Sequence, residues 1–140
     1  MNQNNHSEGK AVSIEPNRRA IVKTIEQFFD GIRRLDADSI TAIFHPRADS
    51  FSLTPRGVCI EPAQVWRDII NQVRDNPEHL FHESFSGRIL DIDVVGTVGT
   101  AKVEWIFKSA RIVDFYNLLK VDGNWLIVNQ VYHTFVGQDT

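Results

Sequence analysis

The spacing of hydrophobic residues divides the chain into a helical first half and a strand-rich second half. Over residues 16–35, apolar residues recur at steps of three and four, which is the period of one buried helix face. A second short helix is expected over about 36–44, because an aspartate can cap its start and a proline ends it. A short hairpin near 51–58 and a third helix over about 62–73 complete this half.

After residue 76 the period changes from helical to two. Four strands are expected over about 83–95, 98–108, 111–121 and 124–136, joined by short turns at Gly96-Thr97, Ser109-Ala110 and Asp122-Gly123. The Asp-Gly pair is the strongest turn signal, since it supplies the positive φ angles of a tight hairpin. Helices followed by a meander of long strands predict an α+β fold with the helices packed on one face of the sheet.

Two-residue turns at these positions also predict which side chains share a face of the sheet. The face that the helices cover is mostly apolar, yet it is expected to carry four groups that are costly to bury, with a tyrosine beside them: Arg88, Asp114, Asn129, His133 and Tyr116. Two interpretations stay open. Either Arg88 and Asp114 form a structural ion pair across two strands, or these polar groups line a small-molecule pocket.

The opposite face is expected to carry an apolar patch on the last two strands. Its members are Phe115, Leu119, Val121, Leu126, Val128 and Tyr132. Exposed apolar surface of this extent marks an interface. We therefore expect a homodimer that pairs through the outer face of the sheet.

Composition narrows the possible classes of function. The 140 residues carry 15 Lys+Arg and 18 Asp+Glu, a formal charge of −3, which lacks the basic footprint of a nucleic-acid binder. No apolar run approaches the ~18 residues of a membrane span, and the single cysteine, Cys59, excludes an internal disulfide. Residues 1–12 are expected to be a disordered polar leader before one domain over 13–140. With no signal-peptide pattern at the start, a cytoplasmic location is expected.

Three stretches of the sequence resemble the putative lumazine-binding family of the nuclear transport factor 2-like superfamily, which also holds ketosteroid isomerases, scytalone dehydratase and polyketide cyclases. Phe29-Asp30-Gly31 and Phe44-His45-Pro46-Arg47-Ala48 resemble the family's "DG…FHP.A" start, and residues 114–128 resemble its "D…L.K.DG.W.IV" hairpin. The resemblance covers about residues 15–136. It implies a cone-shaped, cystatin-like roll, in which three N-terminal helices pack in the concave face of a curved, mostly antiparallel sheet.

The resemblance also implies a pocket between the concave face and the first helices. The residues expected to contact a ligand are His45, Phe51 and Trp66, carried over by position, and Arg88, Trp105 and Asn129, from the expected inner face of the sheet. The candidates for catalysis are Asp114, Tyr116 and His133. His45 could act as a general base, but a structural role is equally well supported, in which it ends a helix and bonds to backbone carbonyls.

These residues support two main hypotheses. The first is binding of a small molecule, aromatic or heterocyclic, in a hydrophobic pocket with a few polar groups. The alternative is a cofactor-free dehydratase, isomerase or cyclase in which Asp114 activates a proton carrier, His133 or His45 moves the proton, and Tyr116 stabilises an oxyanion. A third reading is a dimeric accessory module whose cavity has no ligand.

Neither a cofactor nor a metal is expected. No glycine-rich loop leads from a strand into a helix, as a nucleotide cofactor would require. His79 and His82, flanked by Glu78 and Glu83, fall in a predicted loop, where a spacing of three does not by itself bring side chains together as it does on a helix. Nucleic acid and membrane are likewise not expected as partners.

Overall fold

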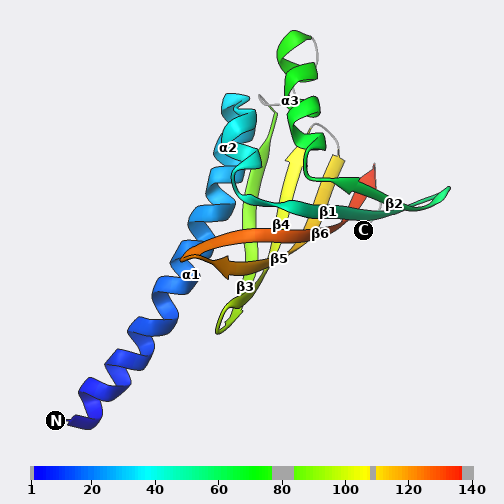
Figure 1. Cartoon of the computed structure of the whole chain (residues 1–140). Coiled ribbons are helices and arrows are strands. Elements are labelled where there is room, and N and C mark those ends of the chain that lie inside the picture. The colour runs from blue at the N-terminus through cyan, green and yellow to red at the C-terminus, as the bar shows by residue number, and fades with distance from the viewer. Residues whose placement is uncertain (1, 77–83, 108–109, 137–140) are drawn as a thin grey trace.

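The computed structural model of the chain is a curved six-stranded sheet with helices on one side (Figure 1). It describes residues 2–76, 84–107 and 110–136, with side chains from Pro16 to Phe135 within those ranges. The elements in chain order are α1 (Asn2–Arg34), α2 (Ala37–Thr41), β1 (Phe44–Thr54), β2 (Gly57–Pro62), α3 (Val65–Asp75), β3 (Ser86–Val95), β4 (Val98–Phe107), β5 (Ala110–Val121) and β6 (Asn124–Val136). Within the described part of the chain, no helix is both long and apolar enough to cross a membrane.

The predicted apolar stripe of the first helix is the core-facing side of α1. Ile21, Ile25, Phe28 and Ile32 are fully buried. α1 packs against both β3 and β6, which stand three places apart in the sheet, so this helix lies across the concave face. The helix begins at Asn2, so residues 2–12 of the predicted leader belong to α1, and the disorder of the leader in solution stays a prediction.

The two shorter helices form close to where they were predicted. Asp36 caps α2, its carboxylate accepting a hydrogen bond from the backbone N–H of Ser39 at 3.1 Å. α3 begins and ends two to three residues later than expected and buries Trp66, Ile70 and Val73. α3 lies on the same side of the sheet as α1, because Trp66 contacts both Phe28 and Trp105, and α2 packs against these two helices.

The sheet has the order β2-β1-β6-β5-β4-β3. All neighbouring strands are antiparallel except β1 and β6, which run parallel. The hairpin turns at Gly96-Thr97 and Asp122-Gly123 are confirmed, and Gly96, Asp122 and Gly123 have the positive φ angles that such turns need. The predicted α+β roll with its mostly antiparallel sheet is therefore confirmed.

The hairpin between β4 and β5 is displaced by two residues from its predicted register, because Phe107 pairs with Ala110. Its turn, residues 108–109, lies outside the described residues. A shift of two keeps every side chain on the same face. Trp105, Asp114 and Tyr116 are consequently buried on the concave face, as predicted.

Elsewhere in the sheet, two β-bulges make the observed register differ from the predicted one. Leu90 on β3 and Val128 on β6 are extra residues without a cross-strand partner. Because side chains alternate between faces, one inserted residue moves every position beyond it to the opposite face.

These bulges reverse three of the polar residues that were predicted to point inward. Arg88, Asn129 and His133 lie on the outer face of the sheet, where they oppose Glu104, Asn117 and Val113 respectively. Gln130 and Tyr132 take the inward positions on β6 instead. The prediction of Tyr132 in the outer patch is therefore also wrong.

Candidate functional site

The most unusual group of the interior is the carboxyl group of Asp114 on β5. It is fully buried and accepts three hydrogen bonds. Trp105 Nε1 donates to Oδ2 at 2.6 Å, the Tyr116 hydroxyl donates to the same oxygen at 3.2 Å, and Gln130 Nε2 donates to Oδ1 at 2.8 Å. The three donors come from β4, β5 and β6, so the alternation of neighbouring strands builds this network.

Burial raises the pKa of the Asp114 carboxyl from 3.8 to about 6, against the opposing effect of hydrogen bonds from Gln130, Trp105 and Tyr116. Burial also raises the pKa of Tyr116 well above its usual value, and the charge of Asp114 beside it adds to the rise. Asp114 therefore changes protonation state close to neutral pH, while Tyr116 keeps its proton.

An aromatic cluster adjoins this carboxyl group through Trp105 and Tyr116. It consists of Phe28 on α1, Trp66 on α3, Phe85 just before β3, Trp105 on β4 and Tyr116 on β5. The ring centres of Phe28 lie 5.1 Å from Trp66 and 6.0 Å from Tyr116, and Trp105 lies 6.4 Å from Trp66 and 5.8 Å from Phe85. Such spacings are typical of edge-to-face and tilted aromatic packing.

The network leaves hydrogen-bonding capacity unused. A carboxylate offers about four acceptor directions, and Asp114 uses three of them. The indole N–H of Trp66 makes no hydrogen bond within the described part of the structure, although Trp66 is mostly buried. The cluster therefore combines apolar ring surface with one spare acceptor and one spare donor.

The structure brings four of the predicted site residues together: Trp66, Trp105, Asp114 and Tyr116. His45 and Phe51 are not part of this cluster. His45 lies on β1, where Nδ1 accepts a hydrogen bond from the Arg47 backbone N–H at 3.0 Å. It lines a separate hollow of about 260 Å³ with Arg67 and Thr41. Phe51 is half-buried in the middle of β1, opposite Val131 of β6.

The interpretation of Arg88 and Asp114 as an ion pair is wrong. Arg88 Nε lies 2.7 Å from Oε1 of Glu104 on the outer face, and Arg111 Nη1 lies 3.4 Å from Oε2 of the same residue. The bulge at Leu90 is the reason, because it turns Arg88 away from the concave face. Among the described residues, no lysine, arginine or histidine forms an ion pair with Asp114.

Sequence reasoning missed Gln130, Phe28 and Phe85 as members of the site. Phe28 is visible in the apolar stripe of α1, but the stripe alone does not say which member faces a polar group. Gln130 points inward only because of the bulge at Val128, and no turn or glycine in the sequence indicates that bulge.

Asn129 and His133, both predicted to contact a ligand or substrate, belong to the outer face. Asn129 accepts a hydrogen bond from Asn117 at 2.8 Å, and the ring of His133 packs edge-on against Phe135 at 4.5 Å. The same face exposes Phe115 (49%) and Val131 (46%), beside a hollow of about 410 Å³. The apolar outer patch is thus present, with Val131 in the place predicted for Tyr132.

No group of three or more histidine, cysteine, aspartate or glutamate side chains within the described ranges is arranged to hold a metal ion. His79 and His82, together with Glu78 and Glu83, lie outside those ranges.

Similar solved structures share this architecture. An NTF2-like protein of unknown function from Shewanella baltica is 30% identical, with 87% of this chain and 96% of that chain covered and a TM-score of 0.74. An NTF2-like protein of unknown function from Methylobacillus flagellatus is 25% identical, with coverages of 86% and 94% and a TM-score of 0.70. A ketosteroid isomerase-like protein from Erwinia carotovora, 10% identical with coverages of 85% and 96% and a TM-score of 0.62, shares the fold alone.

No curated protein matches the sequence significantly. The family described as "Putative lumazine-binding", however, matches residues 16–133, which include all three stretches that carry the sequence resemblance. The chain therefore belongs to the putative lumazine-binding family of the NTF2-like superfamily.

Proposed function

We propose that this protein binds a small heterocyclic molecule against the aromatic cluster, with Asp114 as the polar group that orients it. The observation that carries the proposal is the fully buried Asp114 carboxyl, which has three hydrogen-bond donors and no cation paired with it in the described structure. An ionised carboxylate buried in this way costs stability, and titratable groups with shifted pKa values concentrate at functional sites.

The chemistry of the cluster favours a flat ligand with both hydrogen-bond donors and acceptors. Aromatic rings supply apolar contact area, while the spare acceptor on Asp114 and the free indole N–H of Trp66 supply direction. A pteridine dione such as lumazine has the ring size and the alternating N–H and C=O groups that these two side chains can satisfy. The family description supports the same choice of probe.

The experiment is a titration of the full chain with lumazine, followed by quenching of tryptophan fluorescence. We expect saturable quenching that Asp114→Asn weakens at least about tenfold, because loss of a hydrogen bond to a charged group costs about 1.5–3 kcal/mol. His133→Ala, on the outer face, is the matched control and is expected to bind as the wild type does.

Thermal melting checks that each variant folds. Trp66→Phe provides a second probe, because it removes the free N–H but keeps most of the ring surface. Absence of saturable quenching, or equal binding by the wild type, Asp114→Asn and Trp66→Phe, contradicts the proposal.

A second candidate function is cofactor-free proton transfer, favoured by the pKa of about 6 at Asp114 and by the Tyr116 hydroxyl 3.2 Å away. Asp114 would take a proton from the carbon between the carbonyl and the double bond and return it to the far carbon of that double bond, while Tyr116 would stabilise the oxyanion of the dienolate intermediate. His133 and His45 have no part in this version, since neither belongs to the cluster. Conversion of 3-cyclohexen-1-one to its conjugated isomer, with a rate that rises as the pH passes about 6 and is lost in Asp114→Asn, is the expected result. No turnover contradicts it.

We also propose a homodimer that pairs through the outer face of the sheet. The exposed fractions of Phe115 and Val131 support this, since apolar patches on a sheet face are typical of interfaces. Sedimentation should give a dimer at micromolar concentration for the wild type and a monomer for Phe115→Glu. A monomeric wild type contradicts the proposal. The cytoplasmic location expected from the sequence stays a prediction.

A further inference from the structure

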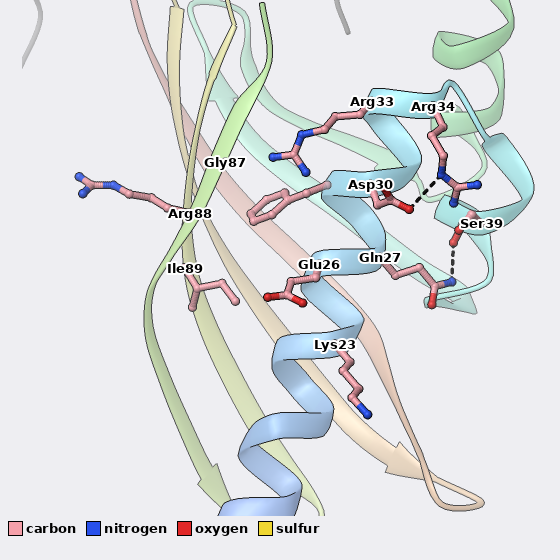
Figure 2. Close-up of a pocket in the computed structure, with 11 residues that line it drawn as sticks. Lys23, Glu26, Gln27, Asp30, Arg33, Arg34, Ser39, Gly87, Arg88 and Ile89 are labelled. Atoms are coloured by element: carbon pink, nitrogen blue, oxygen red, sulfur yellow. Dashed lines mark hydrogen bonds and ion pairs between the residues drawn. The ribbon is translucent and has the colours of Figure 1, made fainter. Parts of the chain in front are cut away.

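A groove of about 940 Å³ runs between the polar side of α1 and the start of β3 (Figure 2). One wall is the side of α1 that carries Glu26, Phe29 and Arg33, the other is Gly87 to Ile89 of β3, and Ser39 of α2 also lines the groove. Because β3 is the last strand of the sheet, the groove lies at the edge of the fold. It does not include any member of the aromatic cluster.

The floor of the groove is apolar and closely packed. A Cβ atom added at Gly87 would lie 2.6 Å from the ring of Phe29, so the ring rests directly on the strand backbone. Ile89 continues this surface along β3. Glycine at position 87 is therefore what allows an aromatic side chain and a strand to form one continuous surface at the bottom of the groove.

The charged side chains around this floor are not equivalent. Figure 2 shows Arg33 and Glu26 reaching from α1 toward β3, while Arg88 points away from the helix. Arg88 is bound to Glu104 on the outer face. In the described structure, neither Arg33 nor Glu26 has an ion-pair partner.

Arg34 and Asp30, also on this helix, already form an ion pair with each other. Arg34 Nε lies 2.9 Å from the carboxylate of Asp30, and Figure 2 shows this pair on the side of α1 away from β3. Lys23 is also directed away from β3. The free charges that face β3 are therefore one guanidinium and one carboxylate.

The spacing of these two charges sets the size of a ligand. Arg33 and Glu26 are seven residues apart on one helix, about two turns, which places their Cα atoms about 10 Å apart along its axis. The guanidinium carbon of Arg33 lies 5.6 Å from the centre of the Phe85 ring, which fixes the positive end next to aromatic surface. The groove thus has a positive end, an apolar floor and a negative end.

We propose that this groove binds a flat aromatic molecule about 10 Å long, with a carboxylate at the Arg33 end and an N–H donor at the Glu26 end. The ring system lies over the floor formed by Phe29, Gly87 and Ile89. Arginine pairs with carboxylates through two parallel hydrogen bonds, and the Glu26 carboxylate accepts from the N–H group. This site is additional to the Asp114 cluster, and the contact of Arg33 with Phe85 is where the two adjoin.

The test uses 6-amino-2-naphthoate, which has an amine and a carboxylate at opposite ends of a rigid double ring. Titration into the ¹⁵N-labelled full chain should shift the backbone amide signals of Phe29, Arg33 and Gly87. Two matched compounds each lack one charge-recognition group: 2-naphthoate has no amine, and methyl 6-amino-2-naphthoate has no free carboxylate. Both are expected to bind more weakly.

Two variants test which protein side chain binds each end of the probe. Arg33→Gln is expected to weaken 6-amino-2-naphthoate and 2-naphthoate about two- to fivefold, the range for exposed ion pairs, and to leave the methyl ester unchanged. Glu26→Gln is expected to weaken the two compounds that carry the amine and to leave 2-naphthoate unchanged. Arg56→Gln, the same charge change in the β1–β2 turn, is the remote control and should have no effect.

Three outcomes overturn this proposal. The first is binding that shifts no groove amide, and the second is equal affinity of all three compounds. The third is an effect of Arg33→Gln on the methyl ester as large as on the acids. A probe that shifts only the Trp66 and Trp105 indole signals occupies the aromatic cluster, which refutes the groove site while supporting the proposed function. Failure of lumazine to bind has no bearing on the groove.

Discussion

Trp105 Nε1 lies 2.6 Å from Oδ2 of Asp114 and donates a hydrogen bond to it. The two residues form a diagonal pair on adjacent strands, since the direct partner of Asp114 on β4 is Val103. This contact joins the aromatic cluster to the buried carboxyl group. The protonation of Asp114, the packing of the cluster and the binding of a ligand are therefore expected to change together.

The first prediction concerns the pH dependence of stability. With a pKa of about 6 in the folded protein, against an ordinary value of 3.8, Asp114 keeps a proton in the folded protein between about pH 4 and 6 that the unfolded chain releases. Its contribution to the free energy of unfolding therefore falls as the pH rises through this window and is constant above it. A rise of about 2 in pKa corresponds to about 3 kcal/mol.

Urea unfolding of the wild type and Asp114→Asn at pH 4, 5, 6 and 7 measures this effect. The variant should gain stability relative to the wild type as the pH rises, because asparagine does not titrate. Curves that stay parallel across the window would show that Asp114 has an ordinary pKa.

The second prediction separates Arg88 from Asp114. Arg88 lies on the outer face with a mostly exposed side chain, so Arg88→Gln should lower the free energy of unfolding by less than about 1 kcal/mol. The change with pH assigned to Asp114 should be the same with and without this substitution. A difference in that change between the two proteins would mean that Arg88 acts on the buried carboxyl after all.

The third prediction compares two buried tryptophans. Trp105→Phe removes the donor to Asp114, a charge-assisted hydrogen bond worth about 1.5–3 kcal/mol. Trp125→Phe removes an N–H that is buried with no partner in the described structure, so its loss sacrifices no hydrogen bond. Chemical denaturation should therefore show Trp105→Phe to be the more damaging by at least about 1.5 kcal/mol. Equal losses would contradict the assigned network.

The fourth prediction tests the contact between Gly87 and Phe29. Gly87→Ala places a Cβ 2.6 Å from the Phe29 ring, and overpacking of this kind costs about 1–3 kcal/mol. Phe29→Leu in the same chain should recover part of the loss, because a smaller side chain leaves room for the methyl group. Thermal melting of the single and double variants measures this, and strictly additive losses would refute the contact.

Much of the fold followed from local patterns in the sequence. The change of the hydrophobic period from that of a helix to two residues predicted helices before strands. Asp122-Gly123 predicted one hairpin, and both residues have the positive φ angles of its turn. The parallel pairing of β1 with β6 was not predicted, because it joins segments about 80 residues apart with no turn between them.

The site was predictable only as far as the strand register held. Trp105, Asp114 and Tyr116 lie on β4 and β5, whose pairing differs from the predicted one by an even number of residues, and so they kept their face. Arg88 and His133 lie beyond single-residue bulges, and each was assigned to the wrong face. A bulge depends on how strands twist and pack in the whole sheet, so local sequence does not reveal it.

The most direct test of the central claim uses the three tryptophan indole signals in a ¹⁵N–¹H spectrum, assigned with single Trp→Phe variants. Lumazine bound at the Asp114 cluster should shift the signals of Trp66 and Trp105, whose rings lie 6.4 Å apart beside the carboxyl group, and leave that of Trp125 in place. Shifts at Trp125 alone, or no shift at any indole, would contradict a ligand site at this cluster.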